Sequence, residues 1–204
     1  MKIKPSKIIC VGLNYKEHAG ELNLDLPAYP IIFLKPPSAL IFHGDAIIYP
    51  PQTKELHYEA ELAVIIKDRC KNVAEKEATK HILGYACGND VTARDLQKID
   101  GQWTRAKSFD TFCALGPEIV SGIDPDALDI KSYLNGELKQ SSNTANMLFN
   151  VRYLISFISQ IMTLEPEDVV LTGTPPGVGP MQAGDTIEIE IEKIGKLINK
   201  VKAA

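Results

Sequence analysis

The sequence predicts a mostly β protein with a few helices, an α+β fold, and two observations support this prediction. Short runs rich in β-branched residues recur along the 204-residue chain, and Gly and Pro separate them. A long helical repeat of apolar residues occurs in one segment only. No internal repeat and no change of composition marks a boundary, so we expect a single domain over residues 1–204.

The expected strands are short runs of apolar and β-branched residues. We assign them to residues 7–11, 31–34, 46–49, 59–67, 82–92, 112–120, 169–172, 186–192 and 196–201. Residues 129–134 and 137–140 flank Asn135-Gly136, a dipeptide that readily adopts the positive φ angles of a type I′ turn. We therefore expect a tight hairpin at this dipeptide.

Two segments are expected to be helical. Asn150 is a good N-cap, and apolar side chains follow it at helical spacing, namely Val151, Leu154, Ile155, Ile158, Ile161 and Met162. This helix should pack its apolar face on a sheet. A shorter helical turn is expected at residues 15–22, because Asn14 and Glu17 resemble a capping box, although its length makes it marginal.

The charge and the apolar runs of the chain exclude several classes of protein. It has 22 Lys and Arg against 26 Asp and Glu and no long basic cluster, so neither nucleic acid nor an anionic membrane is an expected partner. No apolar run approaches the roughly 20 residues of a transmembrane helix, and none resembles a signal-peptide core, so we expect a cytoplasmic protein. The four widely spaced cysteines indicate reduced, buried thiols rather than disulfides or structural zinc.

Glu59 and Glu61 are the residues that most strongly indicate a metal site. Side chains alternate along a strand, so both carboxylates point to one face, and after Glu61 both faces of the run are apolar. Two like charges at the end of a buried strand need a cation, and Asp90 in the next apolar run offers a third oxygen ligand. Carboxylates without cysteine favour Mg²⁺ or Mn²⁺ over Zn²⁺. The alternative is a solvated face with two hydrated glutamates.

Two histidines each have a glutamate at a spacing that could place the two side chains next to each other. His18 and Glu21 would share one face of a helical turn, where the carboxylate could orient the imidazole as a general base. An ordinary surface pair has the same spacing. His57 has the strand parity of Glu59, so it is either a supporting neighbour of a metal ligand or a structural histidine.

A turn rich in Gly and Pro follows the expected strand at 169–172. Residues 173–180 resemble a phosphate loop superficially, but the lysine is missing and the prolines remove amide donors, which excludes nucleotide binding. The backbone N–H groups and the hydroxyl of Thr174 could instead bind a small carboxylate. A plain tight turn is the alternative.

Taken together, these residues resemble the fumarylacetoacetate hydrolase family in its short, single-domain form. The resemblance covers nearly the whole chain and rests on GLNY (12–15) followed by His18 and Glu21, FLKP (33–36), HYEAEL (57–62), DVTARDLQ (90–97), KSFD (107–110) and LTGTPPGVG (171–179). It implies a rolled mixed β-sheet close to a β-barrel, a homodimer, and one divalent ion per subunit. The positions that match the family's metal ligands are Glu59, Glu61 and Asp90.

The resemblance also implies a chemistry and a set of residue roles. The ion would bind a small 2-oxo acid and stabilise the enolate that forms when a bond at C3 is cleaved or deprotonated. Lys107 matches the lysine that contacts the substrate oxyanion, and the substrate-binding positions match Arg94, Gln97, Gly173 and Thr174. His18 and Glu21 match the pair that activates water in the hydrolytic members.

The presence of His18 and Glu21 favours a metal-dependent C–C bond hydrolase acting on acylpyruvates. The alternatives are an oxaloacetate decarboxylase and a decarboxylase or isomerase of the dienoic diacids of aromatic catabolism. A non-catalytic metal or small-acid binding protein would be expected to lack one of the site residues. A cupin-like site would need histidine ligands at strand spacing. Segments 23–30 and 39–45 vary between members, so the sequence does not identify the acyl group.

Overall fold

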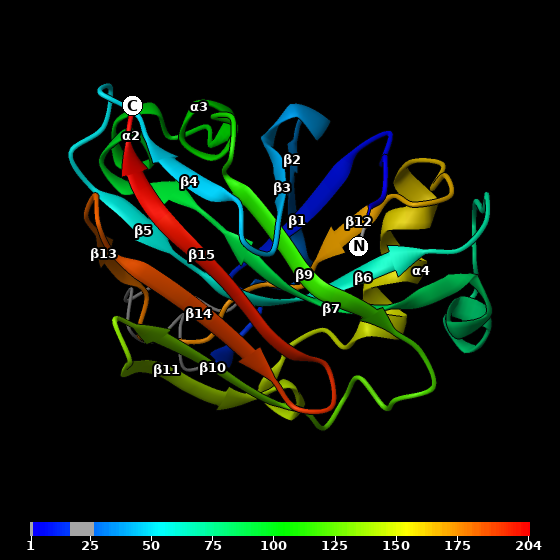
Figure 1. The fold of residues 1–204 in the computed structure, drawn as a ribbon. Coiled ribbons are helices and arrows are strands. Elements are labelled where there is room, and N and C mark those ends of the chain that lie inside the picture. The colour runs from blue at the N-terminus through cyan, green and yellow to red at the C-terminus, as the bar shows by residue number, and fades with distance from the viewer. Residues whose placement is uncertain (1, 17–26) are drawn as a thin grey trace.

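The computed structural model describes residues 2–16 and 27–204, and within them strands predominate (Figure 1). The strands form sheets of seven, five and three strands that curl around a shared interior. This is the mostly β, rolled mixed-sheet fold that the sequence predicted. His18, Glu21 and most of the expected helical turn at 15–22 lie outside the described residues.

The seven-stranded sheet is mixed. Its order is β2 (Ile31–Lys35), β1 (Ile8–Gly12), β12 (Val169–Leu171), β6 (Ala60–Ile66), β7 (Ile82–Asp90), β9 (Cys113–Val120) and β3 (Leu40–Phe42). Two of its pairings, β1 with β12 and β3 with β9, are parallel, and the others are antiparallel. All seven residues of β6 are buried, as expected for a strand that is apolar on both faces.

The five-stranded sheet covers one side of the larger sheet. Its order is β11 (Glu137–Asn143), β10 (Asp129–Leu134), β14 (Thr186–Ile191), β15 (Gly195–Ala203) and β4 (Ala46–Tyr49). β14 and β15 pack against β7, and β15 also contacts β9. The small sheet contains β13 (Gly179–Met181), β5 (Leu56–Tyr58) and β8 (Thr92–Ala93).

The hairpin and the main helix form where local sequence signals predicted them. Asn135 and Gly136 have φ angles of 52° and 82°, and this confirms a turn with two positive φ values between β10 and β11. The helix α4 (Val151–Ile161) begins as predicted, with the Asn150 side chain accepting the Tyr153 N–H at 2.9 Å. Ile161 was expected on the packed face but is 52% exposed, because the helix ends there.

The other helical segments were not predicted. Two short α-helices, α2 (Arg94–Asp100) and α3 (Thr104–Lys107), follow β8 and carry cationic residues of the candidate site. Three 3₁₀ helices, η1 (Pro37–Ala39), η2 (Glu75–His81) and η3 (Thr144–Asn146), occupy connections. Within the described residues, no helix is long and apolar enough to span a membrane.

Asn14 is held by three hydrogen bonds to described residues, whereas Glu17, its expected partner in a capping box, lies outside them. The Asn14 side chain donates to the carbonyls of Phe149 and Thr172 at 3.0 and 2.7 Å and accepts the Phe149 N–H at 2.8 Å. It therefore joins the end of β1 to the segments before α4 and after β12. All four cysteines are buried and free, which confirms that prediction.

Candidate metal centre and active site

Three buried carboxylates meet where β6 begins and β7 ends. Glu59 directly precedes β6, Glu61 is its second residue, and Asp90 is the last residue of β7. The antiparallel register places Ala60 opposite Asn89, so these strand ends lie side by side. One carboxylate oxygen from each residue lies within 4.8 Å of the others, and none of the three residues is more than 5% exposed. The solvated-face alternative for the two glutamates is therefore wrong.

Cationic side chains surround two of these carboxylates. The Lys107 ammonium lies 2.8 Å from Glu59 Oε2 and 2.7 Å from Asp90 Oδ2, and the Arg94 guanidinium pairs with Glu59 Oε1. Burial alone would raise the pKa of Glu59, but Lys107 and Arg94 hold this pKa well below its usual range. Burial opposes the charge of Lys107, yet Asp90 and Glu59 raise its pKa, so the side chain remains an ammonium.

Lys35 is a third buried cation at this site. Its Nζ lies 2.5 Å from Asp90 Oδ1 and donates to the carbonyls of Val91 and Phe112 at 2.9 and 2.7 Å. The side chain is 1% exposed, so the ion pair and both hydrogen bonds are shielded from water. Lys35 therefore pairs with one oxygen of the Asp90 carboxylate while Lys107 pairs with the other.

Glu61 has no lysine or arginine partner among the described residues. Its Oε2 accepts the Gly173 N–H at 2.7 Å, and no described cation lies within ion-pair distance. Burial, followed by the charges of Asp90 and Glu59, raises the pKa of Glu61 well above its usual value. One buried carboxylate is thus left without a counter-charge.

The donor set fits a divalent ion. Glu59, Glu61 and Asp90 offer only carboxylate oxygens, which hard cations such as Mg²⁺ and Mn²⁺ prefer. Burial and the neighbouring carboxylates disfavour the charged form of Glu61, and a bound cation would displace its proton and balance the resulting charge. The other two carboxylates already have cationic neighbours. These residues are therefore suited to hold the metal that the sequence predicted.

The carboxylates open onto a cavity of about 220 Å³. Its lining residues are Val11, Gly12, Leu13, Phe33, Glu59, Glu61, Asp90, Arg94, Gln97, Lys98, Trp103, Lys107 and Thr174. The Phe33 and Trp103 rings meet edge to face at 5.2 Å, and the Lys107 ammonium lies 5.1 Å from the Phe33 centroid. A Cβ at Gly12 would lie 2.7 Å from the Trp103 ring, so glycine is required there for the ring to pack against β1.

Arg94 and Gln97, which the family resemblance matches to substrate-binding positions, both line this cavity. They lie one turn apart on α2, and Arg94 Nη1 donates to Gln97 Oε1 at 2.6 Å. Arg94 Nε also donates to His57 Nδ1 at 3.5 Å. Burial, followed by the charge of Arg94, lowers the pKa of His57 to about 4. His57 is therefore a neutral side chain in contact with Arg94, the cation that pairs with the candidate metal ligand Glu59.

The turn after β12 has two distinct functions in the structure. Gly173 has a φ angle of 97°, and its N–H is committed to Glu61, so it holds a candidate metal ligand instead of lining the cavity. Thr174 does line the cavity, and its hydroxyl oxygen accepts a hydrogen bond from Gln140 Nε2 at 2.8 Å. Of the two residues predicted to bind a substrate carboxylate, Thr174 alone is placed to contact one.

The sequence analysis assigned no role at the site to Lys35 or to the aromatic pair of Phe33 and Trp103. Ile31, Phe33 and Lys35 alternate along β2, so the parity that places Phe33 at the cavity also places Lys35 beside Asp90. A lysine at the end of an apolar strand was the available signal. Trp103 lies between two short helices and leaves no such pattern.

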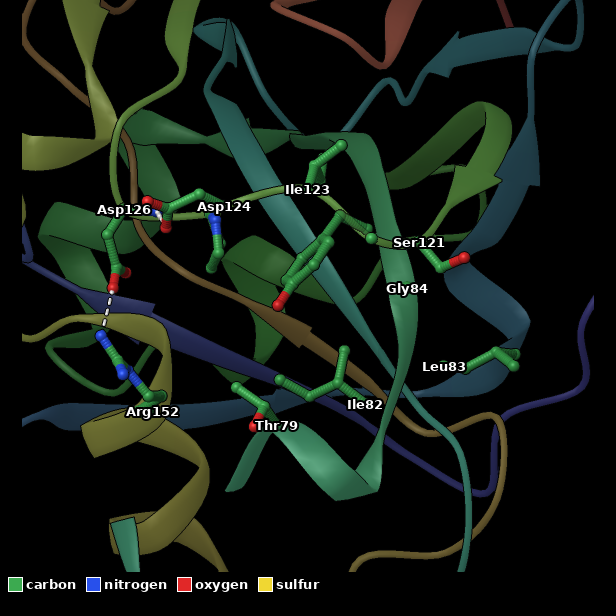
Figure 2. A pocket seen from close by; sticks show the side chains of 12 residues that line it. Thr79, Ile82, Leu83, Gly84, Ser121, Ile123, Asp124, Asp126 and Arg152 are labelled. Carbon is green, nitrogen blue, oxygen red and sulfur yellow. Dashed lines mark hydrogen bonds and ion pairs between the residues drawn. The ribbon is translucent and has the colours of Figure 1, made fainter. Parts of the chain in front are cut away.

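A second hollow lies at the opposite end of β7. Figure 2 shows it between the start of this strand, the loop at 121–126 and Arg152 of α4, and its volume is about 470 Å³. Asp126 pairs with Arg152 at 3.2 Å, and Asp124 accepts the Asp126 N–H at 3.1 Å. Tyr85 in this hollow precedes Asp90 by five residues, which is roughly 17 Å along a strand. The hollow is therefore separate from the carboxylate cluster.

The fold and the candidate site together have the features of an enzyme. A curled mixed-sheet fold gathers three buried carboxylates, two lysines and an arginine beside a small cavity. Such a concentration of charge, with strongly perturbed pKa values in a concave site, is typical of an enzyme that binds a small anionic substrate.

Comparisons with known proteins identify the family. The family model described as fumarylacetoacetate (FAA) hydrolase C-terminal matches residues 7–202. An uncharacterised protein of Methanocaldococcus jannaschii is 60% identical over 201 residues, which cover 98% of this chain and 85% of that protein. A Bos taurus protein named oxaloacetate tautomerase FAHD2B, mitochondrial, is 46% identical over 210 residues, 97% of this chain and 67% of that protein.

A solved structure agrees with these sequence matches. The crystal structure of 5-carboxymethyl-2-hydroxymuconate delta-isomerase from Mycobacterium smegmatis superposes with a TM-score of 0.93 at 47% identity. The superposition covers 99% of this chain and 80% of that chain. The protein described here belongs to the fumarylacetoacetate hydrolase family, and this membership supports its being an enzyme.

Proposed function

We propose that the protein is a divalent-metal-dependent enzyme that forms and stabilises the enolate of a small 2-oxo acid, with oxaloacetate tautomerisation as its first candidate reaction. The observation that carries the proposal is the buried carboxylate cluster, in which Glu61 forms no ion pair with any described residue while Lys107 lines the same cavity. The names of two relatives support it. An oxaloacetate tautomerase and a delta-isomerase both move a proton on a carbon next to an unsaturated centre.

Each cavity residue has a part in this proposal. A divalent ion held by Glu59, Glu61 and Asp90 would act as a Lewis acid towards the oxygens of a 2-oxo acid. Lys107 remains an ammonium, so it supplies positive charge to the developing oxyanion instead of acting as a base. Arg94, Gln97 and Thr174 would bind the carboxylates of the substrate and fix its orientation.

The general base is proposed to be His18, with Glu21 as its orienting partner. The described residues that line the cavity include no histidine, and their one lysine beside the carboxylates is protonated. His18 and Glu21 precede β2 in the chain and follow Leu13, which lines the cavity. A histidine oriented by a carboxylate is suited to proton transfer near neutral pH.

Acylpyruvate hydrolysis is the second candidate function, and the presence of His18 and Glu21 favours it. Cleavage of an acylpyruvate to pyruvate and a carboxylic acid needs an activated water as well as enolate stabilisation. Decarboxylation of oxaloacetate needs only the stabilised enolate, because the departing CO₂ leaves its electron pair on the substrate. The same carboxylate cluster and Lys107 would serve all three reactions.

The test compares substrates on one metal-stripped preparation. The purified protein is treated with a chelator, and then Mg²⁺ or Mn²⁺ is restored with oxaloacetate, acetylpyruvate, fumarylpyruvate or a dienoic diacid. Divalent ions alone catalyse some enolisation, so the rate of the Lys107→Met variant at the same metal concentration is subtracted. We expect metal-dependent turnover of at least oxaloacetate. A failure to accelerate any of these substrates with either metal contradicts the proposal.

We further propose that the chain acts as a homodimer. β2 is an edge strand of the seven-stranded sheet, and Ile31 and Leu34 on it are 39% and 47% exposed. Light scattering after size exclusion should give twice the chain mass of 22.4 kDa. A mass of one chain at micromolar concentration contradicts this proposal.

A further inference from the structure

Gln140 is a buried polar residue outside the lining of the cavity. It lies on β11 in the five-stranded sheet and is 1% exposed. Its Nε2 donates to Thr174 Oγ1 and to the Pro175 carbonyl, both at 2.8 Å. Its Oε1 accepts the Ala60 N–H at 3.1 Å and the Ser132 hydroxyl at 3.0 Å. The amide thus uses both of its donors and both lone pairs of its oxygen.

Two backbone partners fix the orientation of this amide. The Ala60 N–H can only donate, and the Pro175 carbonyl can only accept. Exchanging the oxygen and nitrogen of Gln140 would place two donors against each other and two acceptors against each other. The amide nitrogen therefore faces Thr174, and the Thr174 hydroxyl oxygen must accept its hydrogen bond.

This hydrogen bond determines where the Thr174 proton can go. With its oxygen accepting from Gln140, the hydroxyl must donate elsewhere. The acceptor that the structure offers is the Pro175 carbonyl at 3.5 Å, the upper limit for a hydrogen bond, and Gln140 already donates to that oxygen at 2.8 Å. Because Thr174 lines the cavity, its proton is available to an oxygen of a bound ligand.

Gln140 also connects this hydroxyl to the strand that carries two carboxylates. In the β6–β12 ladder, Leu171 pairs with Ala63, and continuing this register would place Thr174 opposite Ala60. The ladder ends at Leu171 and the backbone turns at Gly173, whose φ angle is 97°, and the Gln140 side chain bridges Ala60 and Thr174 instead. Ala60 lies between Glu59 and Glu61. The Gln140 side chain therefore holds both the turn that carries Thr174 and the strand that carries the two glutamates.

The turn that contains Thr174 and Gly177 packs closely against β11 at Gln140. Gly177 has a φ angle of 96°, and a Cβ there would lie 2.4 Å from the Lys139 carbonyl oxygen and 3.3 Å from Gln140 Cγ. A side chain at 177 would therefore push the turn off the strand. The close approach keeps Thr174 at a fixed distance from Gln140.

We propose that Gln140 is a positioning residue that fixes Thr174 as a hydrogen-bond donor to the carboxylate of the 2-oxo acid. The inference rests on the proposed function, because it identifies what orients one substrate contact of that site. Gln140 itself lies outside the cavity and acts through Thr174.

The experiment measures ligand binding separately from turnover. Oxalate is the probe, since it is a planar dianion with the charge and shape of the enolate end of a 2-oxo acid. Trp103 lines the cavity and is the single tryptophan of the chain, so its fluorescence reports oxalate binding at saturating Mg²⁺. The same variants are then assayed for KM and kcat with oxaloacetate.

Two substitutions at Gln140 should weaken oxalate binding. In Gln140→Glu a carboxylate can accept but cannot donate, so the Thr174 proton turns towards residue 140 and leaves the cavity. In Gln140→Met the Pro175 carbonyl loses its donor and becomes the acceptor of that proton, without added charge. We expect oxalate affinity to fall about 10- to 100-fold, the range for losing a hydrogen bond to a charged group, and KM to rise similarly. Mg²⁺ affinity should change less than threefold.

Three further variants separate positioning from a structural effect. Thr174→Val should lose as much oxalate affinity as Gln140→Met, Thr174→Ser should keep it, and adding Gln140→Met to Thr174→Val should cost little more. Ser132→Ala is the matched control, because it removes a partner of the Gln140 oxygen and leaves the donors in place. Its oxalate affinity should be that of the wild type.

The outcomes are distinct. Wild-type oxalate affinity in Gln140→Met overturns the inference, and so do full additivity with Thr174→Val and a parallel loss of Mg²⁺ affinity. If the wild-type protein itself neither binds oxalate nor accelerates oxaloacetate enolisation with Mg²⁺, the proposed function fails, and this inference fails with it.

Discussion

Replacing Lys107 with Met should separate catalysis from metal binding. The substitution keeps a long, unbranched side chain but removes an ammonium that lies 2.8 Å from Glu59 Oε2 and 2.7 Å from Asp90 Oδ2. Loss of one preorganised charge stabiliser typically lowers kcat by about 10²–10³. Glu59 and Asp90 would each regain an oxygen for a cation, so Mg²⁺ affinity should stay equal or rise.

The same substitution should destabilise the metal-free protein. Removing one partner of a buried ion pair typically costs about 3 kcal/mol, because the remaining charges stay buried without compensation. Glu59 would keep Arg94 and Asp90 would keep Lys35, so the low end of the range applies. Bound Mg²⁺ should recover part of this loss, since an ion at 100 times its Kd adds about 2.7 kcal/mol.

Three measurements on the variant test this reasoning. Steady-state assays with oxaloacetate at saturating Mg²⁺ give kcat and KM, Mn²⁺ titration followed by electron paramagnetic resonance gives the metal Kd, and calorimetry gives Tm with and without Mg²⁺. Lys80→Met is the matched control, because the Lys80 side chain is 68% exposed and does not line the cavity. A change confined to KM would indicate uniform binding, and a weakened metal Kd would show that Lys107 supports the ion. Either result refutes the assigned role.

Two further predictions concern the base and the acid stability of the fold. His18→Ala should lower acylpyruvate hydrolysis by about 10²–10⁴, the usual contribution of a general base, and leave most oxaloacetate decarboxylation, as paired assays at saturating Mg²⁺ would show. Asp168→Asn should lower the free energy of unfolding at pH 7 by about 3 kcal/mol, because the fully buried Asp168 carboxylate accepts the N–H groups of Ser6, Lys7 and Glu165 and pairs with the Lys7 ammonium.

The pH dependence gives Asp168→Asn a second, independent check. Burial alone would raise the pKa of Asp168, but its hydrogen bonds, led by that from Lys7, lower it below the ordinary value. The stabilisation is therefore complete above that ordinary value, about 3.9, and is lost as the pH falls through the folded pKa. Urea unfolding at pH 7 and at pH 3 should show the wild-type advantage shrinking. A stability difference between wild type and Asp168→Asn that is constant with pH contradicts this explanation.

For His18→Ala, an equal loss of acylpyruvate hydrolysis and oxaloacetate decarboxylation contradicts the assignment of His18 as the base.

Features that depend on neighbouring residues were predictable from the sequence. Asn135 and Gly136 specify their own turn, and Asn150 caps the helix that follows it, so both features were identified without knowledge of the fold. β5 and β13 were missed because each has three residues and exists by pairing across more than a hundred positions, as Tyr58 does with Gly179. Such short strands carry no periodicity of their own.

In the candidate site, too, the residues that follow a local pattern were predictable and those that depend on distant contacts were not. Alternation along one strand brought Glu59 and Glu61 together, and the end of the next apolar run located Asp90. The positions of Lys107 and Arg94 followed only from the family resemblance, because short helices of four and seven residues present them. Gln140 left no signal, since its role depends on partners 34 and 80 residues away.

The most direct test of the account is stoichiometric metal binding by the carboxylate cluster. After exhaustive chelation, Mn²⁺ is titrated into wild type, Glu61→Ala and the exposed control Glu137→Ala, and bound ion and oxaloacetate turnover are measured on the same samples. We predict one tight ion per chain and metal-restored turnover in the wild type and in Glu137→Ala, and loss of both in Glu61→Ala. Full activity of chelated Glu61→Ala without added metal would contradict the central claim.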